Sequence, residues 1–247
     1  GNLTCTLEEH THSDECYREL LECTQEEHTH SLECFSDPEA DKETEEDWKK
    51  TVPTGEELKD KTVREQIVMI SQSQKGYKES DKNYQVENET EKKGITRYGQ
   101  WDQDPYEDWT SAYVRFVLHH AGVDTADAKK PASDWLEQLH QAEALKNAEE
   151  AEPGDVLFVY DSSDHLKTGI VEEKMDSTIK ALIGDWDNEV KEQSFNAADE
   201  SVHSIWKPVA TDQKPEEIPT GPDQPEEPKP EEEAKPEDKE EQPAEKS

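Results

Sequence analysis

GITRYGQWDQDPYEDWTSAYVRFVLHHAG, residues 94–122, is the stretch of sequence that decides the fold of this chain. Its first half is polar and contains two tryptophans, and its second half carries apolar residues at the spacing of an amphipathic helix. The apolar face of that helix consists of Trp109, Ala112, Tyr113, Phe116 and Val117. We expect Asp104 to cap the helix, with Pro105 at its first position and Glu107 completing a capping box. Gly122 is its expected end.

The first turn of this helix is a favourable place for a catalytic nucleophile. Unpaired backbone N–H groups and the positive end of the helix dipole stabilise a thiolate there. In this chain the turn carries Thr110 and Ser111, and all four cysteines lie within the first 34 residues. The sequence therefore offers hydroxyl groups, and no thiol, at the position where a nucleophile would act.

This stretch resembles the catalytic segment of CHAP-type amidases, the papain-like hydrolases of bacterial cell-wall enzymes and surface proteins. Their nucleophile segment reads tyrosine or aspartate, tryptophan, cysteine, alanine, and then an aromatic–valine helix. Asp108 and Trp109 match this pattern, whereas Thr110 stands at the cysteine position. GYKES at residues 76–80, followed by Asn83-Tyr84, is similar to the beginning of the family's domain.

The middle of the chain reads as helices followed by strands. Besides the central helix, we expect a helix that Thr62 and Glu65 begin with a capping box, and another at Ser133–Ala148. Gln85–Lys93 is expected to be a loop. Apolar strand patterns then predict strands at Val156–Tyr160, Gly169–Val171, Thr178–Ile183, Val190–Phe195 and Val202–Val209. Helices before an antiparallel sheet is the α+β order of a papain-like domain, and the resemblance spans roughly residues 46–209.

The resemblance also indicates where the catalytic residues of the family would fall. In the family a histidine just before Val-Gly-Ile-Val is the base, and a polar residue orients its imidazole. Matching Gly169–Val171 without a gap puts Lys167 at the histidine position. The family's Glu-Gly-Asn segment corresponds to Ile183-Gly184-Asp185, which puts Asp185 at the orienting position. A protonated lysine cannot accept a proton, and an internal threonine has no activating amine. The resemblance therefore implies a catalytically silent domain with family positions at Thr110, Lys167 and Asp185.

An active enzyme with an unusual nucleophile is the alternative. Thr110 or Ser111 would then attack the substrate, and a two-residue shift would bring in His165 to form a Ser111–His165–Asp185 triad. This alternative requires two positions to be displaced at once. If the catalytic pair is lost, the groove that remains is expected to be lined by aromatic side chains, namely Trp101, Tyr106 and Trp109.

Residues 1–36 contain a tandem repeat in which each copy reads C-x4-H-x-H-x3-C. A segment this short cannot build a core, so a metal ion or a disulfide must hold it together. In the favoured interpretation each copy binds one structural zinc ion, with the ligands Cys5, His10, His12, Cys16, Cys23, His28, His30 and Cys34. The alternative is two disulfides, Cys5–Cys16 and Cys23–Cys34, in an oxidising extracellular setting.

The composition predicts one folded domain with solvated flanks. The chain has 247 residues, 36% of them charged, and a formal net charge of −36. Such an acidic chain repels nucleic acid and anionic membranes, and no apolar run reaches membrane-spanning length. Residues 37–45 are expected to be an acidic linker. Residues 210–247 hold eight of the fourteen prolines together with Glu and Lys, so we expect a disordered tail.

These observations lead to one functional expectation with two alternatives. The favoured expectation is a catalytically inactive CHAP-like module of a Gram-positive bacterial surface protein, extracellular, monomeric and part of a longer chain. Its ligand would be cell-wall peptide, glycan or a host surface protein, with no nucleic-acid or membrane partner. The alternatives are an active peptidoglycan amidase or endopeptidase that uses Ser111 or Thr110, and a purely structural spacer.

Overall fold

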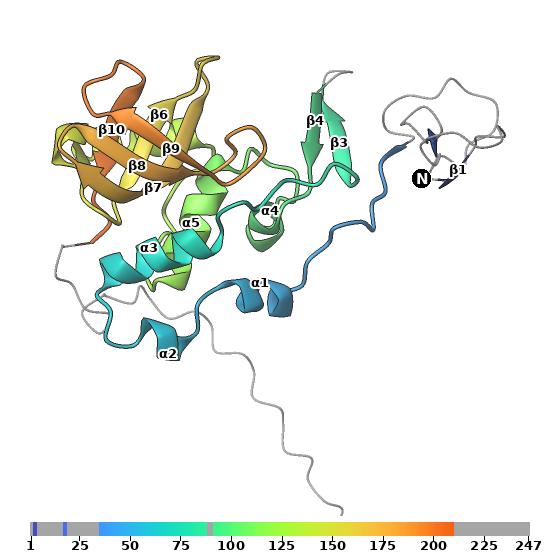
Figure 1. Ribbon diagram of the computed structural model, residues 1–247. Coiled ribbons are helices and arrows are strands. Elements are labelled where there is room, and N and C mark those ends of the chain that lie inside the picture. Colours follow the sequence, from blue (N-terminus) through green and yellow to red (C-terminus); the bar gives the residue numbers. More distant parts are fainter. Residues whose placement is uncertain (1, 4–16, 19–34, 88–90, 210–247) are drawn as a thin grey trace, which may run out of the picture.

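The computed structural model describes residues 2–3, 17–18, 35–87 and 91–209 (Figure 1). The eight cysteines and histidines expected to bind zinc, and the tail from residue 210, lie outside the described residues. The structure therefore bears on the central domain. Near the N-terminus it adds one short antiparallel pair, β1 (Asn2–Leu3) with β2 (Tyr17–Arg18).

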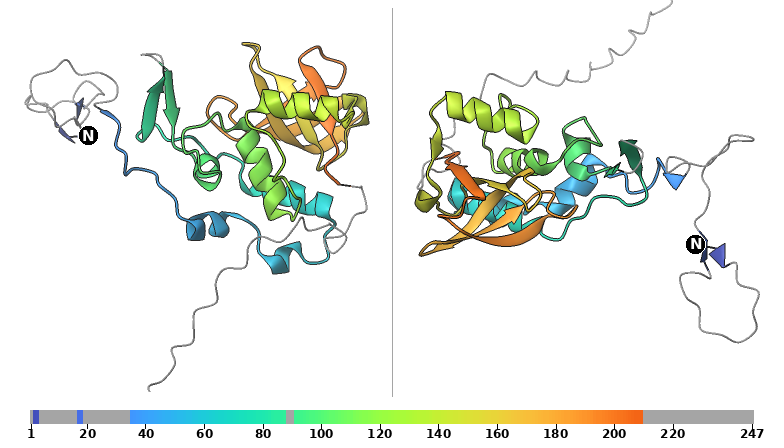
Figure 2. Two further views of the ribbon diagram at one scale, coloured as in Figure 1. Left: turned by 180° about the vertical axis from the view of Figure 1, so that it is seen from behind. Right: turned by 90° about the horizontal axis from the view of Figure 1, so that it is seen from above.

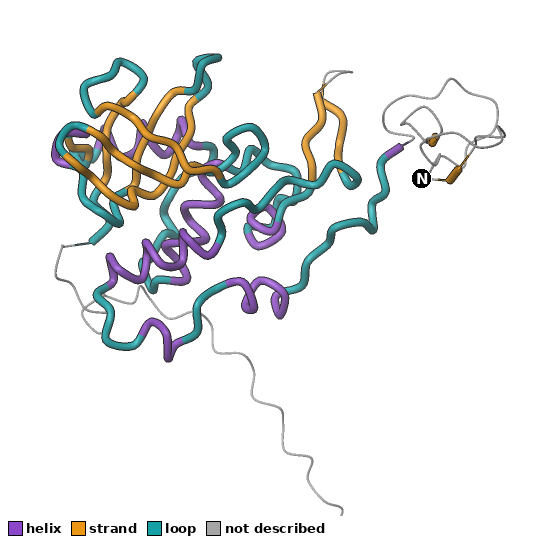
Figure 3. Tube along the Cα trace, in the orientation of Figure 1, coloured by secondary structure: helices purple, strands orange, loops and turns teal. Residues whose placement is uncertain are grey.

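The described part of the chain is a mixed helix-and-sheet structure (Figure 3). The helices are α1 (Glu45–Thr51), α2 (Gly55–Leu58), α3 (Val63–Ser73), α4 (Arg97–Trp101), α5 (Thr110–His120), α6 (Ala132–Gln141) and the 3-10 turn η3 (Ala148–Glu150). The strands are β3 (Tyr84–Glu87), β4 (Glu91–Gly94), β5 (Leu145–Lys146), β6 (Val156–Tyr160), β7 (Leu166–Met175), β8 (Thr178–Ile183), β9 (Lys191–Asn196) and β10 (Val202–Trp206). Apart from the β3–β4 hairpin, the strands of this domain follow its helices, as the sequence predicted.

The main sheet is antiparallel, with the strand order β5-β10-β6-β7-β8-β9. Helices α3, α5 and α6 all contact β7, and Figure 2 shows α5 and α6 on one side of the sheet. The α+β class predicted from the sequence is therefore confirmed. Strands β6 and β8 have the bounds predicted from the sequence. The bounds of β9 and β10 differ from the predicted ones by a few residues at most.

Both faces of the central strand β6 are buried, because alternate side chains of a strand point to opposite sides. Val156 and Phe158 face the helices and join the core that α3 and α5 share. Leu157 and Val159 join a second core on the other face of the strands. Helix α5 is buried from its first residue to Leu118, so it is a central element rather than a surface helix.

Two predictions about the helices were confirmed. Thr62 caps α3, and Glu65 reciprocates by accepting the Thr62 backbone N–H, as the capping box required. The predicted apolar face of α5 is buried throughout. Gly122 follows the end of α5 with φ of +77°, a left-handed conformation that glycine adopts readily.

The predicted start of the central helix was wrong, because α5 begins at Thr110 and not near Pro105. The Pro105 carbonyl accepts the Thr96 N–H at 3.2 Å, a tertiary hydrogen bond that removes it from any helical ladder. Asp108 takes over part of the capping role, since its Oδ1 accepts the Thr110 N–H at 3.3 Å.

Two further segments differ from their predictions. Gln85–Lys93 was expected to be a loop, yet most of it belongs to the β3–β4 hairpin, which Figure 1 shows apart from the main sheet. The helix expected at Ser133–Ala148 ends at Gln141. Glu143 adopts a left-handed φ of 53°, and β5 then pairs with β10 at the sheet edge. In both places strand pairing outweighs local helix or loop preference.

The acidic stretch at 37–45, expected to be a linker, is hydrogen-bonded to the domain. The Asp37 N–H donates to the Lys82 carbonyl at 2.8 Å. The Asn83 side-chain amide donates to the Pro38 and Ala40 carbonyls. The folded domain therefore begins about ten residues earlier than the sequence indicated.

Candidate functional site

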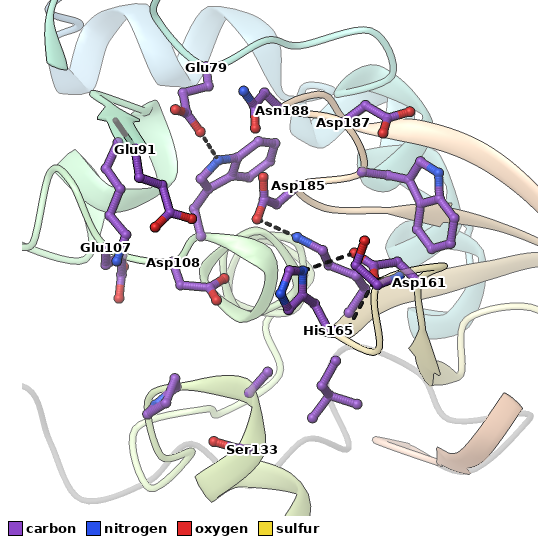
Figure 4. A pocket seen from close by; sticks show the side chains of 18 of the residues that line it. Glu79, Glu91, Glu107, Asp108, Ser133, Asp161, His165, Asp185, Asp187 and Asn188 are labelled. Carbon is purple, nitrogen blue, oxygen red and sulfur yellow. Dashed lines mark hydrogen bonds and ion pairs between the residues drawn. The ribbon is translucent and has the colours of Figure 1, made fainter. Parts of the chain in front are cut away.

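A cleft with a volume of about 660 Å³ opens where the N-terminus of α5 meets the sheet. Its walls come from β7 and the loop before it, the turn between β8 and β9, the β3–β4 hairpin and the start of α6. Figure 4 shows acidic side chains from these segments around one opening. The cleft therefore gathers residues that lie far apart in the sequence.

The Thr110 hydroxyl is committed to structural hydrogen bonds at the base of this region. Its Oγ1 accepts the Thr168 N–H and donates to the Gly184 carbonyl, both at 2.8 Å. In return the Thr168 hydroxyl donates to the Thr110 carbonyl, also at 2.8 Å. Thr110 and Thr168 are both fully buried. This reciprocal pair joins α5 to β7 and to the end of β8, and it engages the Thr110 hydroxyl as both donor and acceptor.

Gly184 allows the first turn of α5 to approach the sheet so closely. A Cβ atom at this position would lie 2.7 Å from a ring carbon of Tyr113 and 3.0 Å from the Thr110 carbonyl oxygen. Only a residue without a side chain avoids that overlap. The close approach also places Asp185, the next residue, beside Lys167 of β7.

Lys167 and Asp185 form an ion pair in the cleft, with 2.7 Å between Nζ and Oδ2. Their side chains are 12% and 16% exposed. Burial raises the pKa of Asp185 to about 6, although the Lys167 ammonium opposes the shift. The structure thus brings Lys167 and Asp185 together next to the Thr110 anchor. The proton-accepting position predicted by the resemblance holds a cation already bonded to a carboxylate.

The alternative triad of Ser111, His165 and Asp185 is not assembled. Ser111 is fully buried and its Oγ has no hydrogen-bond partner, so it does not contact an imidazole. His165 is 72% exposed on the loop before β7, with its Nδ1 3.5 Å from Asp161 Oδ2. Asp185 is bonded to Lys167, so neither of the two contacts of a triad, Ser111 with His165 and His165 with Asp185, is present.

The three aromatic residues expected to line a groove are placed in three different settings. Trp109 lines the cleft, and its indole N–H donates to Glu79 at 2.8 Å. Trp101 packs against Phe116 in the core. The Tyr106 hydroxyl donates to the Asn83 side chain at 2.6 Å. The cleft is therefore bounded mainly by charged side chains, which corrects the expectation of an aromatic groove.

Glu79 is a cleft residue that sequence reasoning did not single out. The backbone at 76–79 pairs with residues 188–190, which brings Glu79 over the N-terminus of α5. Its two carboxylate oxygens accept the Gly94 N–H at 2.6 Å and the Trp109 indole N–H at 2.8 Å. Burial raises the pKa of Glu79, and these two donors oppose the shift. The signal available in the sequence was its place in GYKES, the segment similar to the family.

The cleft carries a strong excess of negative charge. Nine acidic side chains line it, against three lysines: Glu79, Glu87, Glu91, Glu107, Asp108, Asp161, Asp164, Asp185 and Asp187. The lysines are already engaged. Lys167 pairs with Asp185, Lys93 pairs with Glu87 at 2.7 Å, and the Lys92 ammonium lies 4.1 Å from the centre of a tyrosine ring. The net potential in the cleft therefore attracts cations.

Glu107, which lines the cleft, belongs to a cluster of four charged or titratable groups, three of which are largely buried. Asp102 Oδ2 lies 2.5 Å from both Arg115 Nη2 and Lys130 Nζ. Glu107 Oε2 is 3.8 Å from the same arginine nitrogen, and the Glu107 side chain is 9% exposed. Burial, with the neighbouring Asp102 carboxylate, raises the pKa of Glu107 to about 8, so it holds its proton at neutral pH. The sequence had assigned Glu107 only to a helix cap.

Two further properties concern the described residues as a whole. They contain no group of three or more His, Cys, Asp or Glu side chains arranged to hold a metal ion. No helix among residues 35–87 and 91–209 combines the length and apolarity that crossing a bilayer requires. The acidity of the cleft is thus carried by separate carboxylates and not by a preformed metal-binding cluster.

Comparison with known proteins identifies no relative: no protein-family model matches the chain, and neither curated proteins nor solved structures match it.

Proposed function

We propose that the domain ending at residue 209 is a catalytically silent, papain-like (CHAP-like) binding module of a Gram-positive bacterial surface protein. Its acidic cleft is the ligand site. One observation carries the proposal: Thr110 and Lys167 are both bonded to structural partners, where a cysteine amidase needs a thiolate and an imidazole. A scaffold with such a cleft and no nucleophile–base pair retains the capacity to bind.

The surroundings of Thr110 and Lys167 argue against these two residues acting in place of the family's cysteine and histidine. The Thr110 hydroxyl has no base within reach, because its neighbours are a backbone N–H and a carbonyl. The Lys167 side chain donates to the Asp185 carboxylate at 2.7 Å, so it is engaged at the position where the family has its imidazole. Ligands under this proposal are cell-wall peptide, glycan or a host surface protein.

The test separates a binding module from an enzyme and from a spacer. Wild-type protein is incubated with purified cell wall, and released peptides and reducing sugars are measured against an active wall hydrolase. We expect no release, together with retention of the protein on the wall or on a host surface protein. Asp108→Asn combined with Asp187→Asn, which removes two charges from the cleft rim, should weaken that retention.

Two outcomes would overturn the proposal. Release of wall fragments that stops in Ser111→Ala or Thr110→Val would establish the enzyme instead. A protein that binds neither wall nor host surface would leave only the spacer. The double variant Thr110→Cys/Lys167→His restores the residue types that the family uses. If this variant hydrolyses cell wall and the wild type does not, the cleft still positions a wall substrate.

A further inference from the structure

The cleft wall contains an acid with one buried carboxyl oxygen that no hydrogen bond satisfies. Glu107 lines the cleft, its side chain is nine-tenths buried, and its Oε1 has no hydrogen-bond partner. A buried carboxyl oxygen without a partner is destabilising, so it points to a group that arrives from outside.

The cations nearest to Glu107 do not fill this role. Arg115 and Lys130 both contact Asp102 at 2.5 Å, and Lys130 donates a second hydrogen bond, at 2.9 Å, to the Asp102 carbonyl. Arg115 approaches Glu107 only to 3.8 Å. Both cations are thus bound to Asp102, and neither satisfies Glu107 Oε1.

Glu107 belongs to the lining of the cleft, so a change in its side-chain torsions, with the backbone unmoved, is enough to turn its free oxygen toward the opening. Glu91 and Asp108 belong to the same acidic lining. A cation entering the cleft meets a surface of carboxylates and one protonated acid.

We propose that the cleft takes a peptide bearing side-chain ammonium groups, and that Glu107 receives one of these groups and releases its proton to solvent. This inference rests on the binding function proposed above and names its ligand chemistry. The complementary charge comes from the other eight acidic side chains of the lining. The raised pKa of Glu107, about 8, is consistent with a proton held until an ammonium group replaces it.

Proton release provides a direct measurement of this step. A hexalysine peptide is titrated into the full chain by calorimetry at pH 7, in phosphate and in Tris, whose protonation enthalpies differ. We expect a release of about 0.9 proton per bound peptide, the fraction of a group of pKa 8 that is protonated at pH 7. Binding should also become about tenfold tighter from pH 7 to pH 9, because deprotonation of Glu107 no longer opposes it.

Matched variants assign the proton to one residue. Glu107→Gln keeps the shape of the neutral acid, so it should fold and release no proton. It should bind the peptide more weakly than wild type and without the tightening from pH 7 to pH 9. Glu149→Gln, which changes an exposed acid in η3 outside the cleft, should release the same proton as wild type. Acetylated hexalysine, without ammonium groups, should not bind either protein.

The source of the ammonium group is resolved by a second pair of ligands. A cell-wall stem peptide with a free diamino acid side chain is compared with its acetylated form, and hexalysine represents a basic protein segment. Failure of every ammonium-bearing peptide to bind would overturn both the ligand chemistry and the assignment of the cleft as its site. Binding without proton release, or release that persists in Glu107→Gln, would overturn only the role of Glu107.

Discussion

Replacing Thr110 by valine distinguishes a structural hydroxyl from a catalytic one. Valine has the same shape, so the change removes the Oγ1 acceptor of the Thr168 N–H and the donor to the Gly184 carbonyl. Each buried polar group left without a partner costs about 1–3 kcal/mol. The new methyl group gains about 1 kcal/mol of apolar burial in return. With two such polar groups, we therefore expect Thr110→Val to lose about 1–5 kcal/mol of unfolding free energy.

Thr110→Ser is the matched control, because it keeps the hydroxyl and deletes one buried methyl group. It should lose about 1 kcal/mol. Urea unfolding followed by tryptophan fluorescence measures both variants, and the slope with urea should equal that of wild type. If the unfolding free energies of Thr110→Val and the wild type agree within about 0.5 kcal/mol, the structural role of the hydroxyl is refuted. A serine variant that is as unstable as the valine variant would refute it as well.

Three further predictions concern other parts of the chain. Because the pKa of Glu107 is raised from 4.5 to about 8, the folded state binds the extra proton, and its stability should fall as pH rises from 5 to 8. That decline, at most about 1.4 kcal/mol per pH unit, should shrink in Glu107→Gln when unfolding is measured across this range. Arg64 is buried and bonded to Asp155 and to the Pro153 carbonyl, so Arg64→Met should lose about 3–5 kcal/mol in chemical denaturation. Asp155→Asn added to Arg64→Met should recover part of the loss, because no buried charge remains. For the N-terminal repeats, metal analysis should find about one zinc per repeat with thiols titratable after chelation, and denatured protein without thiols would indicate disulfides instead.

Predictions from the sequence were confirmed where neighbouring residues determine the local structure. The Thr62 capping box, the turn at Gly122 and the strand beginning at Val156 depend on neighbouring residues, and all three were placed well. The candidate positions Lys167 and Asp185 were also found to be neighbours in space. Lys167 was placed by matching the strand at 169–171, and Asp185 by matching the segment at 183–185.

The predictions that were wrong share a different cause, namely hydrogen bonds between residues that are distant in sequence. The Pro105 carbonyl is taken by Thr96, which moves the start of the central helix. Pairing of Leu145 with Trp206 ends the region expected to be helical. The acidity of the cleft was missed for the same reason: its carboxylates come from six separate segments, and only the fold brings them together.

The acidity of the cleft argues against amide hydrolysis independently of the residue at position 110. Acyl transfer develops negative charge on the carbonyl oxygen, and active sites stabilise it with N–H donors or cations. Here the cleft holds nine acidic side chains, and its most buried lysine, Lys167, is neutralised by Asp185. An oxyanion formed among these carboxylates would be repelled, whereas an ammonium group would be attracted. The electrostatic potential that opposes turnover is thus the one that favours a cationic ligand.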